Sequence, residues 1–370
     1  MPDQLILAIN PGSSSTKVGL FDGERQTLAE TIRHPESELV RFRRRPILDQ
    51  LAMRSAAVAA WIAEHRIALE RLGAAVGRGG LLPPLQSGTY VVDSDLLALL
   101  ERHERGEHAS NLGAYLANDI AARAGVQAFV VDPVSVDEWP DHVRLSGHPD
   151  LERECLSHAL NTKAVAKRHA STVGTAYEDL RLIVAHLGSG ISISSHQGGR
   201  MIDVTNSREE GPFSPERAGG VPAMKLVELC FSGAFDRRAI EDMLFREGGL
   251  LAYVGTRNVD EVVGRAQAGD EHAGTVIRAM VHQVSREIAA AAAPLRGQVD
   301  AILLTGGMAH SASLVESISQ HVEWIAPVRV YPGEDELAAL AEGALRVLRG
   351  EEEARMVAAV GRALERAHGG

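Results

Sequence analysis

Residues 5–21 read LILAINPGSSSTKVGLF and contain the pattern that decides the fold. An apolar run, Leu5 to Ile9, leads into a turn of small polar residues, and a second run, Val18 to Phe21, follows. Asp22-Gly23 then offers a hairpin turn before a third run from Thr27 to Ile32. Short apolar runs between turn residues predict strands, so we expect the chain to begin with a three-stranded β-meander.

A second meander of the same kind begins about midway along the chain. Its strands are expected at Leu182 to Ala185, Ile191 to Ser195 and Met201 to Val204. Asn10 and His186 occupy matching positions at the ends of the two first strands. This self-similarity is weak, but its long spacing indicates a duplicated domain rather than a solenoid repeat.

After each meander the pattern alternates between helices and strands. We expect helices at Leu51–Leu72, Ser94–His103, Asn111–Arg123, Cys155–His169, Met280–Ala292, near Ser313–Ser319 and at Glu336–Leu348, and strands at Ala74–Val76, Ala128–Val131, Val299–Leu304 and Val328–Tyr331. Such alternation predicts mixed sheets covered by helices. The expected fold is therefore α/β, with two similar domains, 1–150 and 151–337, facing each other across a cleft. Helices over about 338–370 are expected to pack on the first domain.

The composition argues against several classes of protein. The formal net charge is -11, so no basic surface for nucleic acid is expected. Cys155 and Cys230 lie in no CxxC or mixed Cys/His array, which indicates neither a zinc site nor a disulfide framework. Met1 to Asn10 lacks the pattern of a signal peptide, and no apolar stretch approaches the roughly 20 residues of a membrane span. We expect a cytoplasmic protein that binds neither nucleic acid nor membrane.

Two turns of small residues are candidates for binding phosphate. The first, Asn10 to Lys17, contains a glycine, three serines and a lysine, and the second, His186 to Gly190, repeats the arrangement with Gly188 and Gly190. Glycine lets the backbone approach a phosphate, while hydroxyls and amides donate to its oxygens. The GxxxxGK[ST] spacing of a Walker loop is absent. Either turn alone could be a polar hairpin, but two in equivalent places favour a phosphate chain held from both domains.

Further candidates lie at strand ends and in glycine-rich loops. Gly306 and Gly307 follow an expected strand, as in a nucleotide-binding crossover, although a tight strand-to-helix turn has the same pattern. Arg78 and Arg217 lie in glycine-rich loops, where a guanidinium group suits a carboxylate or a phosphate. A surface ion pair is the alternative for each arginine.

The histidines and carboxylates have simpler interpretations too. His108 and His158 could each be an ordinary surface histidine, and His158 is expected on the polar side of a helix. Asp132 follows an expected strand. The run Glu334-Asp335-Glu336 begins a helix, where the helix dipole favours acidic residues; its other role would be to hold magnesium through the water shell of the ion.

Taken together, these motifs resemble the acetate and butyrate kinase family, within the superfamily of actin, Hsp70 and sugar kinases. The resemblance runs from Leu5 to about Arg349, and the butyrate kinase branch fits best. The motifs that carry it are Asn10 to Lys17, Gly77 to Gly80, His108 to Asn111, Val131 to Glu138, Ser157 to Lys167, Gly211 to Ala218 and Pro332 to Glu342.

The resemblance implies two domains of duplicated βββαβαβα topology, ATP and magnesium as cofactors, and a homodimer. By motif match, the terminal phosphate and the nucleotide would meet Asn10, Ser13, Lys17, His186, Gly188, Gly190, Gly306 and Gly307. The transferring phosphoryl group and the acceptor would meet Arg78, Arg217, His158, His108 and Asp132. Magnesium would be held by Asp335 or Glu336.

The implied reaction is reversible phosphorylation of butyrate, or a related short or branched fatty acid, by ATP. Acetate kinases usually carry a Val where this chain has Gly80 and a Phe where it has Ser157, so we expect free volume there for a longer acyl chain. Acetate or propionate is the alternative acceptor. A sugar kinase, with Asp132 as its base, and an ATP-driven binding module like Hsp70 are more distant alternatives.

Overall fold

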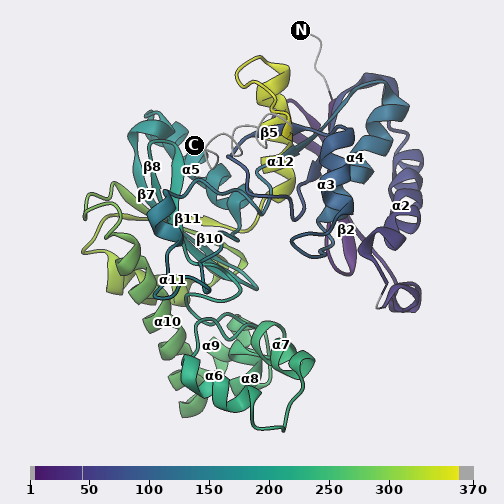
Figure 1. Cartoon of the computed structure of the whole chain (residues 1–370). Helices are drawn as coiled ribbons and strands as arrows, with labels where there is room; N and C mark the ends of the chain where they lie inside the picture. The colour runs from purple at the N-terminus through teal and green to yellow at the C-terminus, as the bar shows by residue number, and fades with distance from the viewer. Residues whose placement is uncertain (1–4, 44, 358–370) are drawn as a thin grey trace. The chain divides into compact units, whose positions relative to one another are not determined.

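The computed structural model describes residues 5–43 and 45–357 (Figure 1). The chain divides into two compact units: unit 1 joins the residues up to Asp137 with those from Asp335 onwards, and unit 2 spans Glu138–Glu334. Unit 1 contains strands β1 (Leu5–Pro11), β2 (Ser15–Asp22), β3 (Arg25–Arg33), β4 (Leu72–Arg78), β5 (Thr89–Val91) and β6 (Gln127–Val131), and helices α1 (Glu36–Leu39), α2 (Leu51–Glu64), α3 (Ser94–Glu101), α4 (Asn111–Ala124) and α12 (Glu336–Leu348).

Unit 2 is built on a second mixed sheet. Its strands are β7 (Arg181–Leu187), β8 (Ile191–Gln197), β9 (Arg200–Val204), β10 (Ala301–Gly306) and β11 (Val328–Pro332). Its helices are α5 (Ala159–Val173), α6 (Ala223–Cys230), α7 (Arg237–Phe245), α8 (Gly249–Val254), α9 (Val259–Gln267), α10 (Glu271–Ala291) and α11 (Ala312–Val322).

The two sheets share one topology. In unit 1 the strand order is β3-β2-β1-β4-β6-β5, and in unit 2 it is β11-β10-β7-β8-β9. Strand β1 pairs antiparallel with β2 and parallel with β4, and β7 does the same with β8 and β10. Apart from the extra edge strand β5, each sheet is a three-stranded meander extended by two parallel strands. The predicted α/β fold class and its duplicated topology are confirmed.

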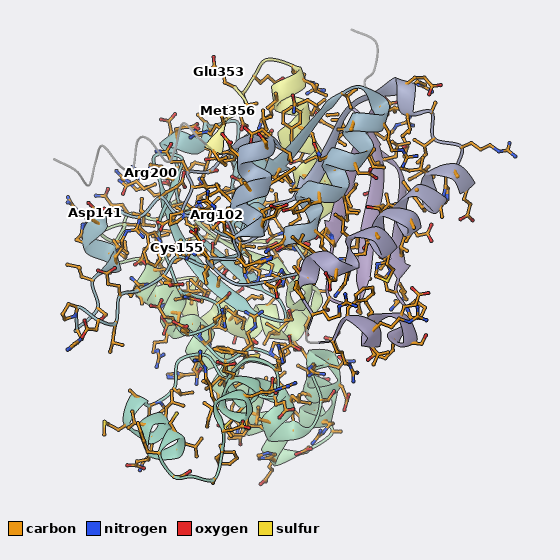
Figure 2. The ribbon with its side chains drawn as sticks, turned by 45° about the vertical axis from the view of Figure 1, so that its right-hand side comes forward. Arg102, Asp141, Cys155, Arg200, Glu353 and Met356 are labelled. Carbon is orange, nitrogen blue, oxygen red and sulfur yellow. The ribbon has the colours of Figure 1, made fainter. Side chains whose placement is uncertain are left out.

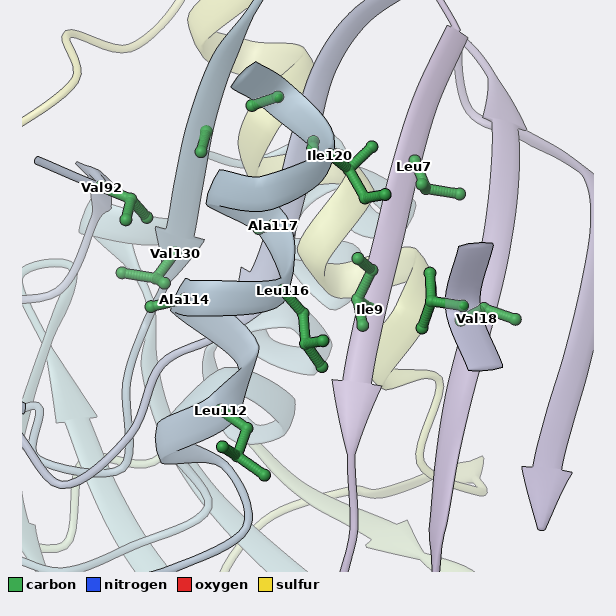
Figure 3. Close-up of a cluster of buried hydrophobic side chains, with 14 of the residues drawn as sticks. Leu7, Ile9, Val18, Val92, Leu112, Ala114, Leu116, Ala117, Ile120 and Val130 are labelled. Atoms are coloured by element: carbon green, nitrogen blue, oxygen red, sulfur yellow. The ribbon is translucent and has the colours of Figure 1, made fainter. Parts of the chain in front are cut away.

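Helices cover both faces of the sheet in unit 1. Side chains of α4 at i, i+4 spacing, Leu112, Leu116 and Ile120, pack against Leu7 and Ile9 of β1 (Figure 3). Alternate residues of a strand face opposite sides, so the intervening β1 residues turn towards the other face. There α12 packs against β1, β4 and β6. At Gly343 this helix approaches β6 so closely that a Cβ atom would lie 2.5 Å from the Val131 side chain.

The sheet of unit 2 is covered in the same way. One face of β7 and β10 packs against α5 in a cluster that includes Leu182, Val184 and Leu303. The opposite face, with Ile183 and Leu304, packs against α10 and α11. Helices α6 to α9 gather near one end of α10 (Figure 1).

Several predicted helices have different bounds in the structure. The helix expected over Leu51–Leu72 ends at Glu64, because the chain reverses at Arg66, whose φ is 52°. The helix expected from Cys155 begins at Ala159, so Cys155 is a buried residue of the preceding loop (Figure 2). The helix expected from Met280 begins at Glu271, capped by the Asp270 side chain.

The expected helical tail does not follow α12 directly: residues 349–356 are not helical, and helical structure resumes at Val357. Gly350 has a φ of 72°, the left-handed conformation that commonly ends a helix, and α12 stops at Leu348. Arg355 then forms a β-bridge with Tyr90 beside β5. The remainder of the expected tail, residues 358–370, lies outside the described residues. By contrast, the bounds predicted for α12 are confirmed at both ends.

Candidate active site

The turn between β1 and β2 presents hydrogen-bond donors, while its serine carbonyls are engaged. Its three serine carbonyls all accept hydrogen bonds from unit 1: Ser13 from Arg54 Nη2, Ser14 from the His34 amide, and Ser15 from both Arg54 Nη1 and the Gly12 amide. In the described part of the chain, the amides of Ser13 and Ser14 and the hydroxyls of all three serines donate to no protein group. This turn is therefore a set of donors suited to an anion.

Arg78, Glu336 and Asn10 come together beside this turn. Arg78, the last residue of β4, lies 2.5 Å from Glu336 Oε1 through Nη1, and Asn10 Nδ2 donates to Glu336 Oε2. Glu336 is buried because it is the first residue of α12, which packs on β1. Arg78 Nε is buried and has no hydrogen-bond partner among residues 5–43 and 45–357, which leaves one donor of this guanidinium group free within them.

The glycines around Arg78 serve close packing. A Cβ atom at Gly77 would lie 2.0 Å from the carbonyl oxygen of Gly113, at the start of α4. One at Gly79 would lie 2.5 Å from Pro133, and one at Gly80 would lie 2.6 Å from the Cα atom of Asn111. The expectation of free volume beside Gly80 is therefore wrong, because Asn111 fills that space and its Oδ1 accepts from the Leu81 amide.

Two more predicted residues of unit 1 have local partners. Asp132 is buried with a φ of 37°, and its Oδ1 accepts from Ser87 Oγ at 2.6 Å and from the Gly88 amide at 2.8 Å. His108 is exposed, and its Nδ1 lies 2.8 Å from Ser110 Oγ. Ser110, the residue before α4, makes no side-chain capping hydrogen bond. Lys17 and Ser13 are exposed at the serine turn.

In unit 2, two histidines stack on each other at the end of β7. The rings of His158 and His186 are 3.8 Å apart and inclined by 9°. Asn161 Oδ1 lies 2.9 Å from His186 Nδ1, and Glu334 Oε1 lies 3.1 Å from Nε2. Because both partners are acceptors, the ring donates to both only when both nitrogens carry hydrogen. His158 is bonded through Nδ1 to Ser192 Oγ at 3.0 Å.

His158 lies at the N-cap of α5 rather than on its side, which corrects the predicted placement. Ser157 before it is buried, with Oγ 3.7 Å from Met201 Sδ. The side chain at this position thus points at β9. Because Ser157 and His158 lie before the first residue of α5, helical periodicity does not predict where their side chains point.

Arg217 reaches the same turn from the loop after β9. Its Nη1 donates to the Ser207 carbonyl at 3.0 Å, and burial lowers the pKa of its guanidinium group. A Cβ atom at Gly190 would lie 2.8 Å from Arg217 Nη1 and 3.3 Å from His158 Cε1. The loop is joined to the turn by Ser214 Oγ, which donates to the Ser189 carbonyl at 2.5 Å. Gly190 thus lies between an arginine and a histidine.

A cavity of about 420 Å³ opens beside this cluster within unit 2. Its lining includes Gly188, Glu334 and Gly307. Gly306 and Gly307 differ in role: a Cβ atom at Gly306 would lie 2.4 Å from the Leu187 carbonyl oxygen, whereas one at Gly307 would meet nothing within 4 Å. Gly306 therefore permits strand packing, and Gly307 leaves the cavity open.

The acidic run at 334–336 divides among three environments. Glu334 contacts His186, Asp335 is exposed, and both oxygens of Glu336 are engaged by Arg78 and Asn10. Over residues 5–43 and 45–357, no three His, Cys, Asp or Glu side chains gather as a metal site. Magnesium in nucleotide sites usually takes one or two carboxylates and completes its shell with phosphate and water. The run at 334–336 could supply such a small number of carboxylate ligands.

Sequence reasoning missed several residues of these clusters. Asn161 lies three positions after His158, a spacing that places two side chains on one side of a first helical turn. Ser192 and Ser214 carry no distinctive pattern in the sequence. Arg54 had a signal, since it interrupts a mostly apolar helix. It is fully buried in the structure.

The fold is that of known carboxylate kinases. An acetate kinase from Porphyromonas gingivalis has a TM-score of 0.74 at 18% identity, covering 92% of this chain and 99% of that one. A propionate kinase from Francisella tularensis has a TM-score of 0.72 at 18% identity, covering 92% of this chain and 98% of that one. An acetate kinase from Entamoeba histolytica has a TM-score of 0.73 at 14% identity, with the same coverage as the propionate kinase.

The sequence itself carries the family relationship. Residues 153–337 match the acetokinase family, and they make up half of the chain. That segment contains the stacked histidines, Arg217 and the cavity beside Gly307. The chain belongs to the acetokinase family.

Proposed function

We propose that this protein is an ATP-dependent kinase of a short-chain carboxylate, with butyrate or a related fatty acid as acceptor. The observation that carries the proposal is the convergence of Arg217 and His158 on Gly190. His186 stacks on His158 beside the cavity of unit 2. Unit 1 contributes a donor turn at Ser13 and Ser14 and the free Nε of Arg78.

Positive charge and donors are what this reaction requires of a protein. A carboxylate is already ionised at neutral pH, with an ordinary pKa of roughly 4–5, so it needs no general base. Its approach to a triphosphate is opposed by repulsion between anions. Arginine, histidine and lysine side chains can offset that repulsion, and an arginine that contacts transition-state charge contributes about 10³–10⁵ in rate in other phosphoryl transfers.

In the proposed step, a carboxylate oxygen attacks the terminal phosphorus of ATP in line with the leaving group. The new bond joins that oxygen to phosphorus, and the bond from phosphorus to the β,γ-bridging oxygen breaks. The products are acyl phosphate and ADP, and the reverse reaction follows the same path. Arg78, Arg217 and His158 would contact the phosphoryl group, and Asn10, Ser13 and Lys17 would orient the terminal phosphate.

The cavity beside Gly307 is the proposed place of the nucleoside. Its volume of about 420 Å³ and its open glycine suit a ligand of that size. Asp335, the exposed carboxylate of the run, would hold magnesium, which offsets phosphate charge when bound with the nucleotide, and Glu336 would take part only by releasing Arg78 or Asn10. We place Asp132 and His108 near the acceptor on the family resemblance.

We propose butyrate, rather than acetate or propionate, as the acceptor because two motifs resemble those of the butyrate kinase branch. These motifs run from Asn10 to Lys17 and from Gly211 to Ala218. The contacts of Gly80 and Ser157 do not account for such a preference, since both positions are packed. A sugar kinase would need a free carboxylate base. Asp132 Oδ1 is instead engaged by Ser87 and Gly88, which favours an anionic acceptor. A homodimer in the cytoplasm is part of the same proposal.

The test is formation of an acyl phosphate. Purified protein with ATP, magnesium and hydroxylamine should produce hydroxamate only when a fatty acid is added. Acetate, propionate, butyrate and isobutyrate are compared by kcat/KM, and butyrate should exceed acetate by tens- to hundreds-fold, since each methylene discriminates roughly 10- to 200-fold at best. ADP release that needs glucose, or no acceptor at all, would contradict the proposal.

A further inference from the structure

Arg54 is a fully buried guanidinium group directly behind the serine turn of unit 1. It belongs to α2 and uses all five of its N–H donors. Nη1 donates to the Ser15 carbonyl and Thr16 Oγ1 at 2.9 and 3.0 Å, Nη2 donates to the Ser13 carbonyl and Gln50 Oε1 at 3.1 and 2.9 Å, and Nε donates to the same Gln50 oxygen at 3.1 Å.

None of these partners carries a negative charge. Within the part of the chain that the structure describes, no carboxylate lies at ion-pair distance from Arg54. A buried charge is normally paired, because removing it from water is costly. Burial accordingly lowers the pKa of Arg54 to about 10. The packing of unit 1 does not by itself explain why an unpaired positive charge lies beneath a turn whose donors are free.

The contacts of Arg54 also determine which way the peptide groups of the turn point. In a trans peptide, the carbonyl of one residue and the N–H of the next point in opposite directions. Arg54 binds the Ser13 carbonyl, so the Ser14 amide points away from the guanidinium group. That amide is one of the two that donate to no protein group.

Thr16 and His34 complete this arrangement. Thr16 Oγ1 accepts from Arg54 and is also hydrogen-bonded to His34 Nε2 at 2.9 Å. Burial, and then the charge of Arg54, lower the pKa of His34, while Glu38 opposes the shift. The His34 amide binds the Ser14 carbonyl at 2.9 Å. The carbonyls of Ser13, Ser14 and Ser15 are thus all held by Arg54 or His34.

We propose that Arg54 is a positioning residue for the terminal phosphate of the nucleotide: its fork draws the turn carbonyls inward and leaves the turn amides and hydroxyls to the phosphate. This inference rests on the proposed function, because it takes the serine turn as the phosphate site. Arg54 itself touches no ligand, so its effect must be specific to ligands that carry the terminal phosphate.

The test compares two ligands by calorimetry, the imido analogue of ATP with magnesium and AMP, in wild type, Arg54→Met and Arg54→Lys. Arg54→Met should weaken binding of the ATP analogue by about 10-fold or more and binding of AMP by less than about 2-fold. The reason is that the turn then no longer holds its donors toward the charged terminal phosphate. Arg54→Lys keeps the positive charge but lacks the planar guanidinium fork, so its affinity for the ATP analogue should lie between those of wild type and Arg54→Met. Arg123→Met, on the exposed side of α4, is the matched control and should change neither ligand.

Equal weakening of both ligands, or no change in a folded variant, would overturn the inference. If Arg54→Met does not fold, Arg54→Lys alone decides: it must weaken the ATP analogue selectively. The hydroxamate assay on wild type separates the two proposals. Wild type that binds the analogue without making hydroxamate would refute carboxylate phosphorylation, while the ligand comparison would still decide the role of Arg54.

Discussion

Arg78, which is partly buried, and Glu336, which is buried, form an ion pair that joins the end of β4 to the first residue of α12, with Nη1 2.5 Å from Oε1. The same carboxylate accepts from Asn10 of β1, so one acidic side chain holds two residues that we assign to phosphate binding. Breaking a buried pair from one side leaves an uncompensated charge, which costs about 3–5 kcal/mol. Stability and activity can therefore be separated at this pair.

Arg78→Met should lower both the melting temperature and kcat, the latter by about 100-fold or more. The double variant Arg78→Met/Glu336→Gln removes the stranded charge but keeps an acceptor for Asn10, so the melting temperature should recover while kcat stays low. Arg349→Met, which breaks the exposed pair with Glu24, is the control and should change little. Recovery of kcat in the double variant would contradict the assignment of Arg78.

Gly190 should be sensitive to a single methyl group. A Cβ atom there would overlap the ends of the Arg217 and His158 side chains rather than backbone, so those side chains can move aside. Gly190→Ala should therefore lower kcat at least about 10-fold with a small change in melting temperature. Gly264→Ala, on α9 with open space around it, is the control. If Gly190→Ala kept the wild-type kcat, it would argue that Arg217 takes no part in the reaction. The direct test is Arg217→Ala, whose kcat should be about 100-fold lower than that of wild type.

Gly80 should behave in the opposite way. Its Cβ atom would meet the Cα atom of Asn111 at 2.6 Å, so Gly80→Ala should force α4 to shift and cost about 1–3 kcal/mol. The melting temperature should fall, and kcat/KM for acetate and butyrate should fall in equal proportion. Gly307→Ala, which meets nothing within 4 Å, should keep the melting temperature of wild type. If Gly80→Ala lowered kcat/KM for butyrate more than for acetate, Gly80 would be part of the acyl site after all.

His196 makes stability depend on pH. Burial and the charge of Lys163 lower the pKa of His196 to about 3, and its ring bridges Tyr177 and Ser194 in the neutral form. The unfolded chain takes up this proton near pH 6.5, and the folded chain does so only near pH 3. Stability is therefore complete above about pH 6.5 and is lost as the pH falls, by about 1.4 kcal/mol per pH unit from this group.

Melting temperatures of wild type and His196→Gln between pH 5 and 7 test this dependence. His34 and His169, whose pKa values are also lowered, contribute to the slope in both proteins, so His196→Gln should show a shallower slope rather than none. The control is His321→Gln, at an exposed position of α11. An unchanged slope in His196→Gln would show that the buried ring is not the group responsible.

Much of the sheet structure could be predicted from the sequence because strand runs and turn glycines are local signals. The meander at Leu5 to Ile32 and its counterpart at Leu182 to Val204 have the predicted order, and α12 has the predicted bounds. Helix ends without glycine or proline were less predictable: the end of α2 depends on a positive φ at Arg66. Helices α6 to α9 and strand β5 were not predicted; each spans only three to nine residues.

The candidate site could be predicted in part for the same reason. Loop motifs indicate Arg78 and Arg217, and the family resemblance indicates His158, but the partners of all three come from distant segments. Nothing local to Glu336 indicates that it pairs with Arg78, and the glycine at position 80 gave no sign that Asn111 would fill its space. Those contacts depend on how α4 and α12 pack on the sheet, which no local pattern records.

The packing of α12 against β1, β4 and β6 has a consequence for the order in which the protein can fold during synthesis. Unit 2 is continuous in the chain, whereas unit 1 needs a helix that is synthesised after the whole of unit 2. Until then, one apolar face of the first sheet, including Ile6 and Val131, lacks its cover. The nascent chain must keep that face from aggregating while all of unit 2 is synthesised, which makes the uncovered sheet of unit 1 the expected client of a chaperone.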